Sequence, residues 1–329
     1  MSSNKNTISK INIDAFDRRI LFELDRNARI TATQLGKIIR KSKQFVDYRI
    51  KKLEQAGVLR GYITVIDYSK FGYQSLRIYL SFRNISPKKQ VELENDLMQD
   101  KDVWWLVTGE GPWNVGYAIA VRDTLEFYPY WDSIMKKYRP FIKKYSIVLY
   151  THIRQYPKSY IINQKNSDPG TLVGASTIRR DLTPKQHNLL KYISGNGRSS
   201  LLDIAKNIKT SAQAAKYQMK QLEKYGIIQG YRALIDVSFL GYRYYKAYLN
   251  FTHTNRTKEL EEFCKQHPNI LNTNRTIGGR DFEIELQVRS FNEFESIINE
   301  LREKFAGMID DYEWAIAKEE KKMVYFPFE

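Results

Sequence analysis

An internal repeat constrains this chain more than any other feature of its sequence. Residues 41–62 are KSKQFVDYRIKKLEQAGVLRGY, and residues 210–231 are TSAQAAKYQMKQLEKYGIIQGY. Aligned without a gap at an offset of 169, nine of the 22 positions are identical. The same offset continues to Gly109 and Gly278, so the repeated unit is half of the protein. The 329 residues therefore predict two similar halves, each long enough to bury a core of its own.

Each half begins with a pattern that predicts three short helices. In the first copy, Asp14 precedes a run of apolar residues at helical spacing, and Thr31 with Gln34 forms a capping box for a second helix. Ser42 caps a third helix, which ends at Gly57. The second copy repeats these signals between residues 183 and 226. The pattern indicates a compact helical unit in each half.

The third helix of each unit carries a polar face opposite its apolar stripe. Long hydrogen-bond donors and amides on one helix face suit the base edges and phosphates of a DNA major groove, and a merely solvated face is the alternative. The candidate DNA-binding residues are Ser42, Lys43, Gln44, Asp47, Tyr48, Arg49, Lys51 and Lys52 in the first copy, and Ser211, Gln213, Lys216, Tyr217, Gln218 and Lys220 in the second.

Net charge favours the DNA interpretation because it is localised. The chain has 53 Lys and Arg against 37 Asp and Glu, a net charge of +16 and a pI of about 9.6. Residues 14–66 hold 12 basic and 6 acidic side chains, and residues 183–235 hold 9 and 2. These net charges of +6 and +7 sum to 13 of the 16. Such a footprint predicts double-stranded DNA as the partner.

A second pattern follows each helical unit. Apolar alternation predicts strands near residues 76–82, 103–106, 115–121 and 145–151, with helices near 87–99 and 124–138 between them. In the second copy, Phe282, Ile284 and Leu286 alternate with Glu283 and Glu285. The order β-α-β-β-α-β implies a ferredoxin-like sheet with both helices on one face, so the other face must meet solvent or a partner.

The predicted fold class is α+β, with two tandem copies of a three-helix unit followed by a ferredoxin-like sheet domain. The expected divisions are 12–68 and 183–237 for the helical units, 69–156 and 238–329 for the sheet domains, and 157–182 for a linker. The linker is rich in Pro, Gly, Ser and Asn, and as a flexible coil it would reach roughly 28 Å. Pairing of the halves within one chain is thus permitted, and exchange between chains is open.

Several classes of protein are disfavoured by composition. The chain has one cysteine, Cys264, so no intrachain disulfide framework is expected. The first ten residues lack an apolar signal core, and no apolar run approaches the roughly 18 residues needed to span a bilayer. Cys264 and His267 have no second ligand pair, so no metal site is expected. No cofactor is expected either. The chain is expected to be cytoplasmic, with no membrane partner.

The stretch RITATQLGKIIRKSKQFVDYRIKKLEQAGVLRGYITVIDYSKFGY resembles the winged helix-turn-helix of the leucine-responsive and asparagine-synthetase regulators, the Lrp/AsnC family. TGEGPWNVGYAIAVRD resembles that family's regulatory domain, with Gly111-Pro112-Trp113-Asn114 at its Gly-x-Tyr-Asp turn. The resemblance implies a transcriptional regulator, not an enzyme. It also implies an intrachain pseudo-dimer, with further homo-oligomers and with the exposed sheet faces packed together.

The resemblance further implies a small amino acid or related metabolite as effector. The residues it points to are Gly109, Gly111, Trp113 and Asn114 in the first copy, and Gly278, Gly279 and Asp281 in the second. The chain departs from the family at three places. Asn114 replaces the usual acid, the second turn is followed by two fewer residues before the next strand, and Gln218 stands where the first copy has Arg49.

An enzyme is the alternative, because a fused pair of such halves also resembles the siroheme decarboxylases. That function needs histidines and arginines in the sheet domains to bind a tetrapyrrole. The candidates are His152, His253, His267, Arg77, Arg154 and Arg275.

Overall fold

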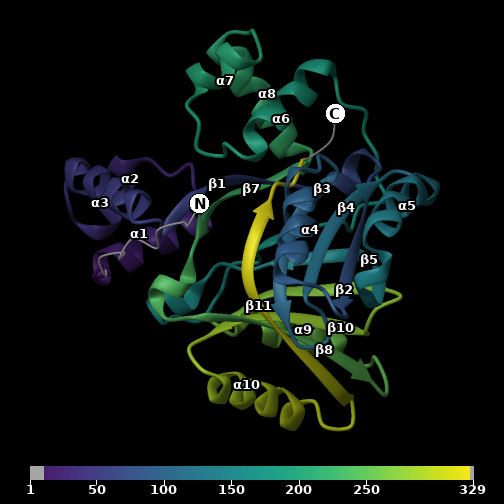
Figure 1. The fold of residues 1–329 in the computed structure, drawn as a ribbon. Helices are drawn as coiled ribbons and strands as arrows, with labels where there is room; N and C mark the ends of the chain where they lie inside the picture. The colour runs from purple at the N-terminus through teal and green to yellow at the C-terminus, as the bar shows by residue number, and fades with distance from the viewer. Residues whose placement is uncertain (1–10, 327–329) are drawn as a thin grey trace.

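The computed structural model describes residues 11–326 and contains two helical units, each ending in a strand. The elements of the first unit are α1 (Ala15–Arg26), α2 (Ala32–Ile39), α3 (Lys43–Gln55) and β1 (Leu59–Ile66). Those of the second are α6 (Pro184–Ser194), α7 (Leu201–Asn207), α8 (Ala212–Lys224) and β7 (Ile228–Ile235). Figure 1 shows the units as separate lobes, with β1 and β7 between them.

Local sequence signals fix where these helices begin. Asp14 and Thr31 each form the reciprocal bonds of a capping box, and Ser42 accepts a bond from the Phe45 backbone N–H. Leu35 and Val46 are fully buried in the core that the first three helices share. The three-helix unit therefore follows the predicted pattern.

The sheet domains have the predicted order. The first contains β2 (Gln74–Phe82), α4 (Pro87–Gln99), β3 (Val103–Glu110), β4 (Val115–Val121), α5 (Phe127–Tyr138) and β5 (Ile142–Gln155). The second contains β8 (Arg243–Phe251), α9 (Thr257–Gln266), β9 (Ile270–Ile277), β10 (Phe282–Val288), α10 (Phe291–Lys304) and β11 (Ile309–Met323). Helices α4 and α5 share one core with the first sheet, and α9 and α10 share another with the second, so the α+β fold class is confirmed.

The two sheets join at both edges. Strand β11 pairs with β3, strand β5 pairs with β9, and β2 pairs with both β4 and β5. Eight strands of residues 11–326 thereby close into a ring in the order β2-β4-β3-β11-β8-β10-β9-β5. A further antiparallel pair, β1 with β7, links the helical units. The halves thus pair with each other within one chain.

The sheet face that carries Glu283 and Glu285 meets the other half of the chain. Both glutamates are 1% exposed, and Gln287 is 6% exposed, because these side chains point into the ring. Arg77 of the first half contacts Glu285 at 3.2 Å, and Lys246 contacts Glu283 at 2.9 Å. The inside of the ring is therefore a paired, charged core, as buried charges require.

The segment between the halves is not the flexible coil that its composition predicted. Ser159–Ile162 forms a 3₁₀ turn (η4), and Thr171–Val173 forms a short strand (β6) that pairs with β5. Tyr160 lies in the core of the first helical unit, with its ring centroid 4.3 Å from that of Tyr242. Apolar side chains within a polar segment give it fixed contacts with both halves. No helix among residues 11–326 is long and apolar enough to cross a membrane.

Candidate nucleic-acid interface

Helices α3 and α8 present most of the predicted residues to solvent. The exposed members are Ser42, Lys43, Gln44, Tyr48 and Lys51 on the first unit, and Ser211, Gln213, Lys216, Tyr217 and Lys220 on the second. The two serines also cap their helices, because each side chain accepts a backbone N–H three residues on at 3.1 Å. Each helix thus carries an amide, lysines and a tyrosine on one accessible face.

Tyr48 and Tyr217 occupy equivalent positions on that face. They are 64% and 59% exposed, respectively. The ring of neither side chain contributes to a core, yet an aromatic residue stands here in both copies. Tyrosine hydroxyls and rings suit contacts with a phosphate or a base edge.

The acidic member of the predicted set, Asp47, is neutralised locally. Its carboxylate lies 3.1 Å from the Lys43 ammonium, one helical turn away. Both side chains are substantially exposed, so the pair contributes little to stability. The pair reduces the repulsion that a free carboxylate would exert on a phosphate.

Arg49 does not point outward with the other predicted residues. Its guanidinium contacts the Asp17 carboxylate at 3.1 Å and the Asp14 carboxylate at 2.5 Å, and its side chain is 15% exposed. These bonds hold α3 against α1, so the Arg49 guanidinium is turned away from the exposed face, and its contact with DNA stays a prediction. Lys52 is also half-buried. Burial raises the pKa of Asp17, and the Lys52 charge lowers it in part.

The sequence held a signal for this role of Arg49. Counted at the repeat offset, Asp14, Asp17 and Arg49 correspond to Thr183, Gln186 and Gln218. The two acids and the base are thus absent together from the second copy, as expected of side chains in contact. Gln218 is half-buried, so it also lies off the exposed face.

Reciprocal arginines join the two helical units. Arg29, between α1 and α2, donates to the Gly197 carbonyl at 3.0 Å, and Arg198, between α6 and α7, donates to the Ile30 carbonyl at 3.0 Å. Their guanidinium carbons lie 5.2 and 5.5 Å from the ring centroids of Tyr231 and Tyr62. Composition gave no reason to separate these arginines from the other basic residues.

These contacts explain two of the nine identical positions of the repeated stretch. Tyr62 donates to Glu54 at 2.6 Å, and Tyr231 donates to Glu223 at 2.7 Å. Burial, with the nearby glutamate in second place, raises the pKa of both tyrosines, so both remain neutral donors. Each copy keeps these residues because each third helix is tied to its strand, and each strand to the opposite unit.

The predicted effector turns serve the structure in large part. Trp113 is buried and donates to the Tyr248 hydroxyl at 2.7 Å, and Asn114 accepts from the Phe82 backbone at 2.8 Å. A side chain at Gly109 would lie 1.9 Å from the Trp113 ring. Asp281 accepts from the Phe251 backbone at 2.7 Å.

The turns of the two halves nevertheless meet at one cavity. Its volume is about 440 Å³, and it lies beside the pseudo-twofold pair Tyr79 and Tyr248. The predicted residues that line it are Trp113, Gly278 and Gly279. Gly109, Gly111, Asn114 and Asp281 are not among its lining residues. Gly111, with φ of 122°, is next to the Trp314 backbone instead.

The cavity adjoins the charged core of the ring. The Lys246 ammonium donates to the hydroxyls of Tyr79 at 2.7 Å and Tyr150 at 2.8 Å. Burial by itself would raise the pKa of Glu285, but Lys246 and Arg77 outweigh it and lower the pKa to about 2. Period-two alternation predicted that Glu283 and Glu285 share a face, but it did not indicate that Lys246 and Arg77 are their partners.

The residues considered for a tetrapyrrole site do not line that cavity. Arg77 is bonded to Glu285, and Arg154 donates to the Pro169 carbonyl at 3.2 Å. His152 lies opposite Arg275 in the register of β5 with β9, and both side chains are exposed. His253 is exposed, and burial lowers the pKa of His267 to about 4. Among residues 11–326, no three His, Cys, Asp or Glu side chains are grouped to hold a metal ion.

Comparisons with known proteins match both helical units. The model of the winged helix-turn-helix DNA-binding family matches residues 13–60 and 182–229. An uncharacterised HTH-type transcriptional regulator of Pyrococcus abyssi is 48% identical over 60 residues, which are 18% of this chain and 39% of that protein. LrpB, an HTH-type transcriptional regulator of Bacillus subtilis, is 38% identical over 72 residues, which are 22% of this chain and 48% of that protein. The chain thus covers less than half the length of these two relatives.

The whole chain also matches a solved structure. The siroheme decarboxylase NirDL superposes with a TM-score of 0.61 at 14% identity, covering 96% of this chain and 94% of that one. At this identity the match establishes the duplicated fold alone. The resemblance of the sequence to the Lrp/AsnC regulators is confirmed by the curated relatives, which include the leucine-responsive regulatory protein of Rhizobium meliloti, 38% identical over 66 residues, or 20% of this chain and 42% of that protein.

Proposed function

We propose that this chain, whose two halves are each of the Lrp/AsnC type, is a sequence-specific DNA-binding transcriptional regulator that reads DNA with both third helices. The observation that carries the proposal is the pair of exposed faces on α3 and α8, in units that the β1 and β7 pair and two reciprocal arginines hold together. The charges of +6 and +7 in these units support it.

Unlike recognition faces imply unlike half-sites. Lys43 of the first helix is replaced by Ala212 in the second, and Asp47 is replaced by Lys216. We therefore expect an imperfect palindrome with half-sites about one helical turn, or a multiple of it, apart. Footprinting of DNA fragments selected by the purified full chain tests this. One enriched motif with two different arms is the expected result, and the absence of any enriched motif would exclude the function.

An amino-acid effector is the finer part of the proposal. The cavity of about 440 Å³ between the turns is large enough for such a ligand, and Lys144 and Glu313 offer charges of both signs at its wall. A thermal-shift series over the twenty amino acids tests it, with Ser81→Phe as the variant that places a bulkier side chain at the cavity wall. Stabilisation by one amino acid that this variant abolishes is expected. No shift above about 1 °C for any of them would exclude an amino-acid effector, since saturation at 100 times Kd adds roughly 2.7 kcal/mol.

A siroheme-decarboxylase-like enzyme is the second candidate, favoured by the full-length match to NirDL. Against it stand the bonded state of Arg77 and the exposed position of His152. Titration with an iron tetrapyrrole separates the functions. A saturable absorbance change at one equivalent would favour the enzyme, whereas a spectrum unchanged from that of the free tetrapyrrole is expected.

A further inference from the structure

The two halves build the same ledge below their helical units. Asp67 and its counterpart Asp236 each precede a 3₁₀ turn, η1 (Tyr68–Phe71) and η5 (Val237–Leu240). The carboxylate of Asp67 accepts from the Ser69 hydroxyl at 2.6 Å, and that of Asp236 accepts from the Ser238 hydroxyl at 2.6 Å. In both ledges the side-chain oxygens of the acid and the serine can accept hydrogen bonds from a second segment.

In the first half, the segment that joins the halves occupies this ledge in an extended form. The Gly174 backbone N–H donates to Asp67 at 3.0 Å, and the Ser176 backbone N–H donates to the Ser69 hydroxyl at 3.1 Å. Just before them, β6 adds to the edge of β5 as an antiparallel strand. Gly174 has φ of 90°, and a Cβ there would lie 3.1 Å from the Thr151 carbonyl. Only about 110 Å³ of space remains beside this segment.

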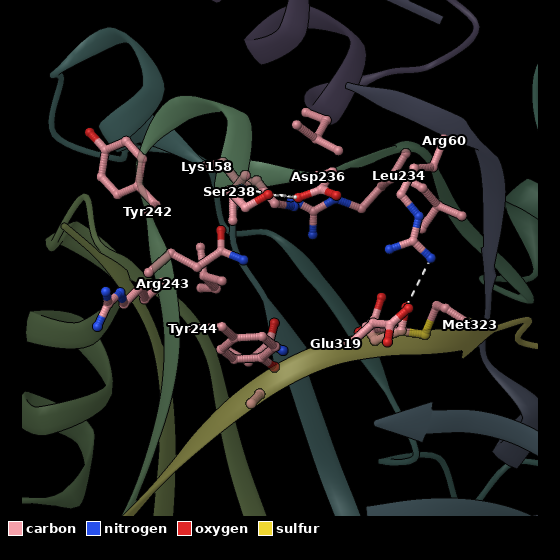
Figure 2. Close-up of a pocket in the computed structure, with 18 of the residues that line it drawn as sticks. Arg60, Lys158, Leu234, Asp236, Ser238, Tyr242, Arg243, Tyr244, Glu319 and Met323 are labelled. Carbon is pink, nitrogen blue, oxygen red and sulfur yellow. Dashed lines mark hydrogen bonds between the residues drawn. The ribbon is translucent and has the colours of Figure 1, made fainter. Parts of the chain in front are cut away.

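In the second half, the same ledge faces an open cavity of about 560 Å³. Figure 2 shows Asp236 and Ser238 on one wall and Glu319 and Met323, on β11, on the opposite wall. Arg60 crosses part of the space and donates to the Glu320 carbonyl at 2.8 Å. Among residues 11–326, no second segment donates a backbone N–H to Asp236 or Ser238, and Arg60 reaches into only part of the space.

The cavity wall also holds an unpartnered buried acceptor. Gln155 is 8% exposed and lines the cavity, and its side-chain oxygen has no hydrogen-bond partner among residues 11–326. An uncompensated polar atom of this kind is unfavourable, so a ligand that donates to it gains binding free energy. Asp236, Ser238 and Gln155 together present acceptors to a ligand rich in N–H groups, and Leu234 and Met323 give it apolar surface.

We propose that this cavity binds an extended peptide whose backbone N–H groups donate to Asp236 and Ser238, as Gly174 and Ser176 donate in the first half. A peptide backbone is the ligand that the first ledge already holds in place, and addition of a strand at an open sheet edge is a common mode of peptide recognition. The occupant is a separate peptide rather than a second copy of this chain, since the connecting segment of each copy is already seated on its own first half. The site does not depend on DNA binding.

The probe is the acetylated, amidated and fluorescently labelled peptide Thr-Leu-Val-Gly-Ala-Ser, the sequence of residues 171–176. Anisotropy titration against the full chain is expected to give saturable binding at one site. The matched control peptide is N-methylated at the glycine and serine nitrogens, which removes the two donating N–H groups and keeps the glycine that a φ of 90° requires. This control is expected to bind at least about 10-fold more weakly, because losing even one hydrogen bond to a charged group reduces the affinity by about that factor.

Asp236→Ala is the matched protein variant, and Asp67→Ala is its counterpart in the first half. Asp236→Ala is expected to weaken binding of the probe by at least about 10-fold. Asp67→Ala is expected to keep the probe's affinity within about twofold of that of the unaltered chain. Equal affinity of the two peptides for the unaltered chain would overturn the proposal regardless of how the variants fold. Failure to saturate at millimolar probe, or a loss of affinity confined to Asp67→Ala, would overturn it as well.

Discussion

Replacing Arg49 with glutamine tests whether this residue supports the helical unit or contacts DNA. In the structure its guanidinium bonds to Asp17, which is 1% exposed, and to Asp14, which is 38% exposed. Removing it leaves the Asp17 carboxylate buried without its base. Breaking a fully buried pair costs about 3–5 kcal/mol, and the partial exposure of Arg49 and Asp14 reduces this to about 2 kcal/mol.

Hydrogen exchange followed by mass spectrometry measures the effect where it occurs. A loss of about 2 kcal/mol in the local opening free energy corresponds to roughly 30-fold faster exchange of the α1 amides. The amides of α6 in the second unit are the internal control, because Gln218, the counterpart of Arg49, has no such acids to hold. Exchange there should remain unchanged in the Arg49→Gln variant.

A triple variant sharpens the test. Asp14→Thr, Asp17→Gln and Arg49→Gln together install the residues that the second copy uses. Because the buried carboxylate is then removed with its base, most of the lost protection should return. If Arg49→Gln instead left α1 exchange unaltered and weakened one DNA half-site tenfold, the assignment of Arg49 to packing would be refuted.

Three further predictions address DNA binding and the charged core. If each helical unit neutralises about four phosphates, the slope of log K against log salt should be near −7, and binding insensitive to salt would contradict this. Tyr48→Ala and Tyr217→Ala should each weaken binding about tenfold while leaving the unfolding temperature unchanged, since both rings are exposed. The lowered pKa of Glu285 predicts a contribution to stability that is complete above its ordinary pKa of 4.5 and is lost as the pH falls toward about 2. Unfolding free energies of Glu285→Gln should lack that part of the pH dependence, and a parallel pH profile would contradict the prediction.

Local periodicity was sufficient to predict the three helices of each helical unit and the order of helices and strands in the sheet domains, but not β6 in the connecting segment. The capping box at Thr31 and the alternation from Phe282 onward each involve neighbours in the sequence, so their signals are complete in a short window. The inward bonds of Arg49 were not predicted because its partners lie 32 and 35 residues away. No window that contains the helix alone contains them.

The cavity of the second half was beyond prediction for a related reason. A repeat predicts two equal ledges, and Asp67 and Asp236 do correspond. Their difference arises from the connecting segment, whose composition suggested a mobile coil and whose fixed place depends on β5 and on the first ledge. Such long-range contacts leave no periodic trace in the sequence.

The pairing of β1 with β7, and of each sheet with the other, has a consequence for dilution. In a homodimeric reader, the two recognition helices meet only when two chains associate, so occupancy of the DNA falls steeply once protein concentration drops below the dimer Kd. In the DNA reader proposed for this chain, the covalent connection makes that meeting intramolecular, and its effective concentration does not change when the solution is diluted. The fraction of molecules in which both third helices are paired would therefore be the same at a few copies per cell as in a concentrated solution.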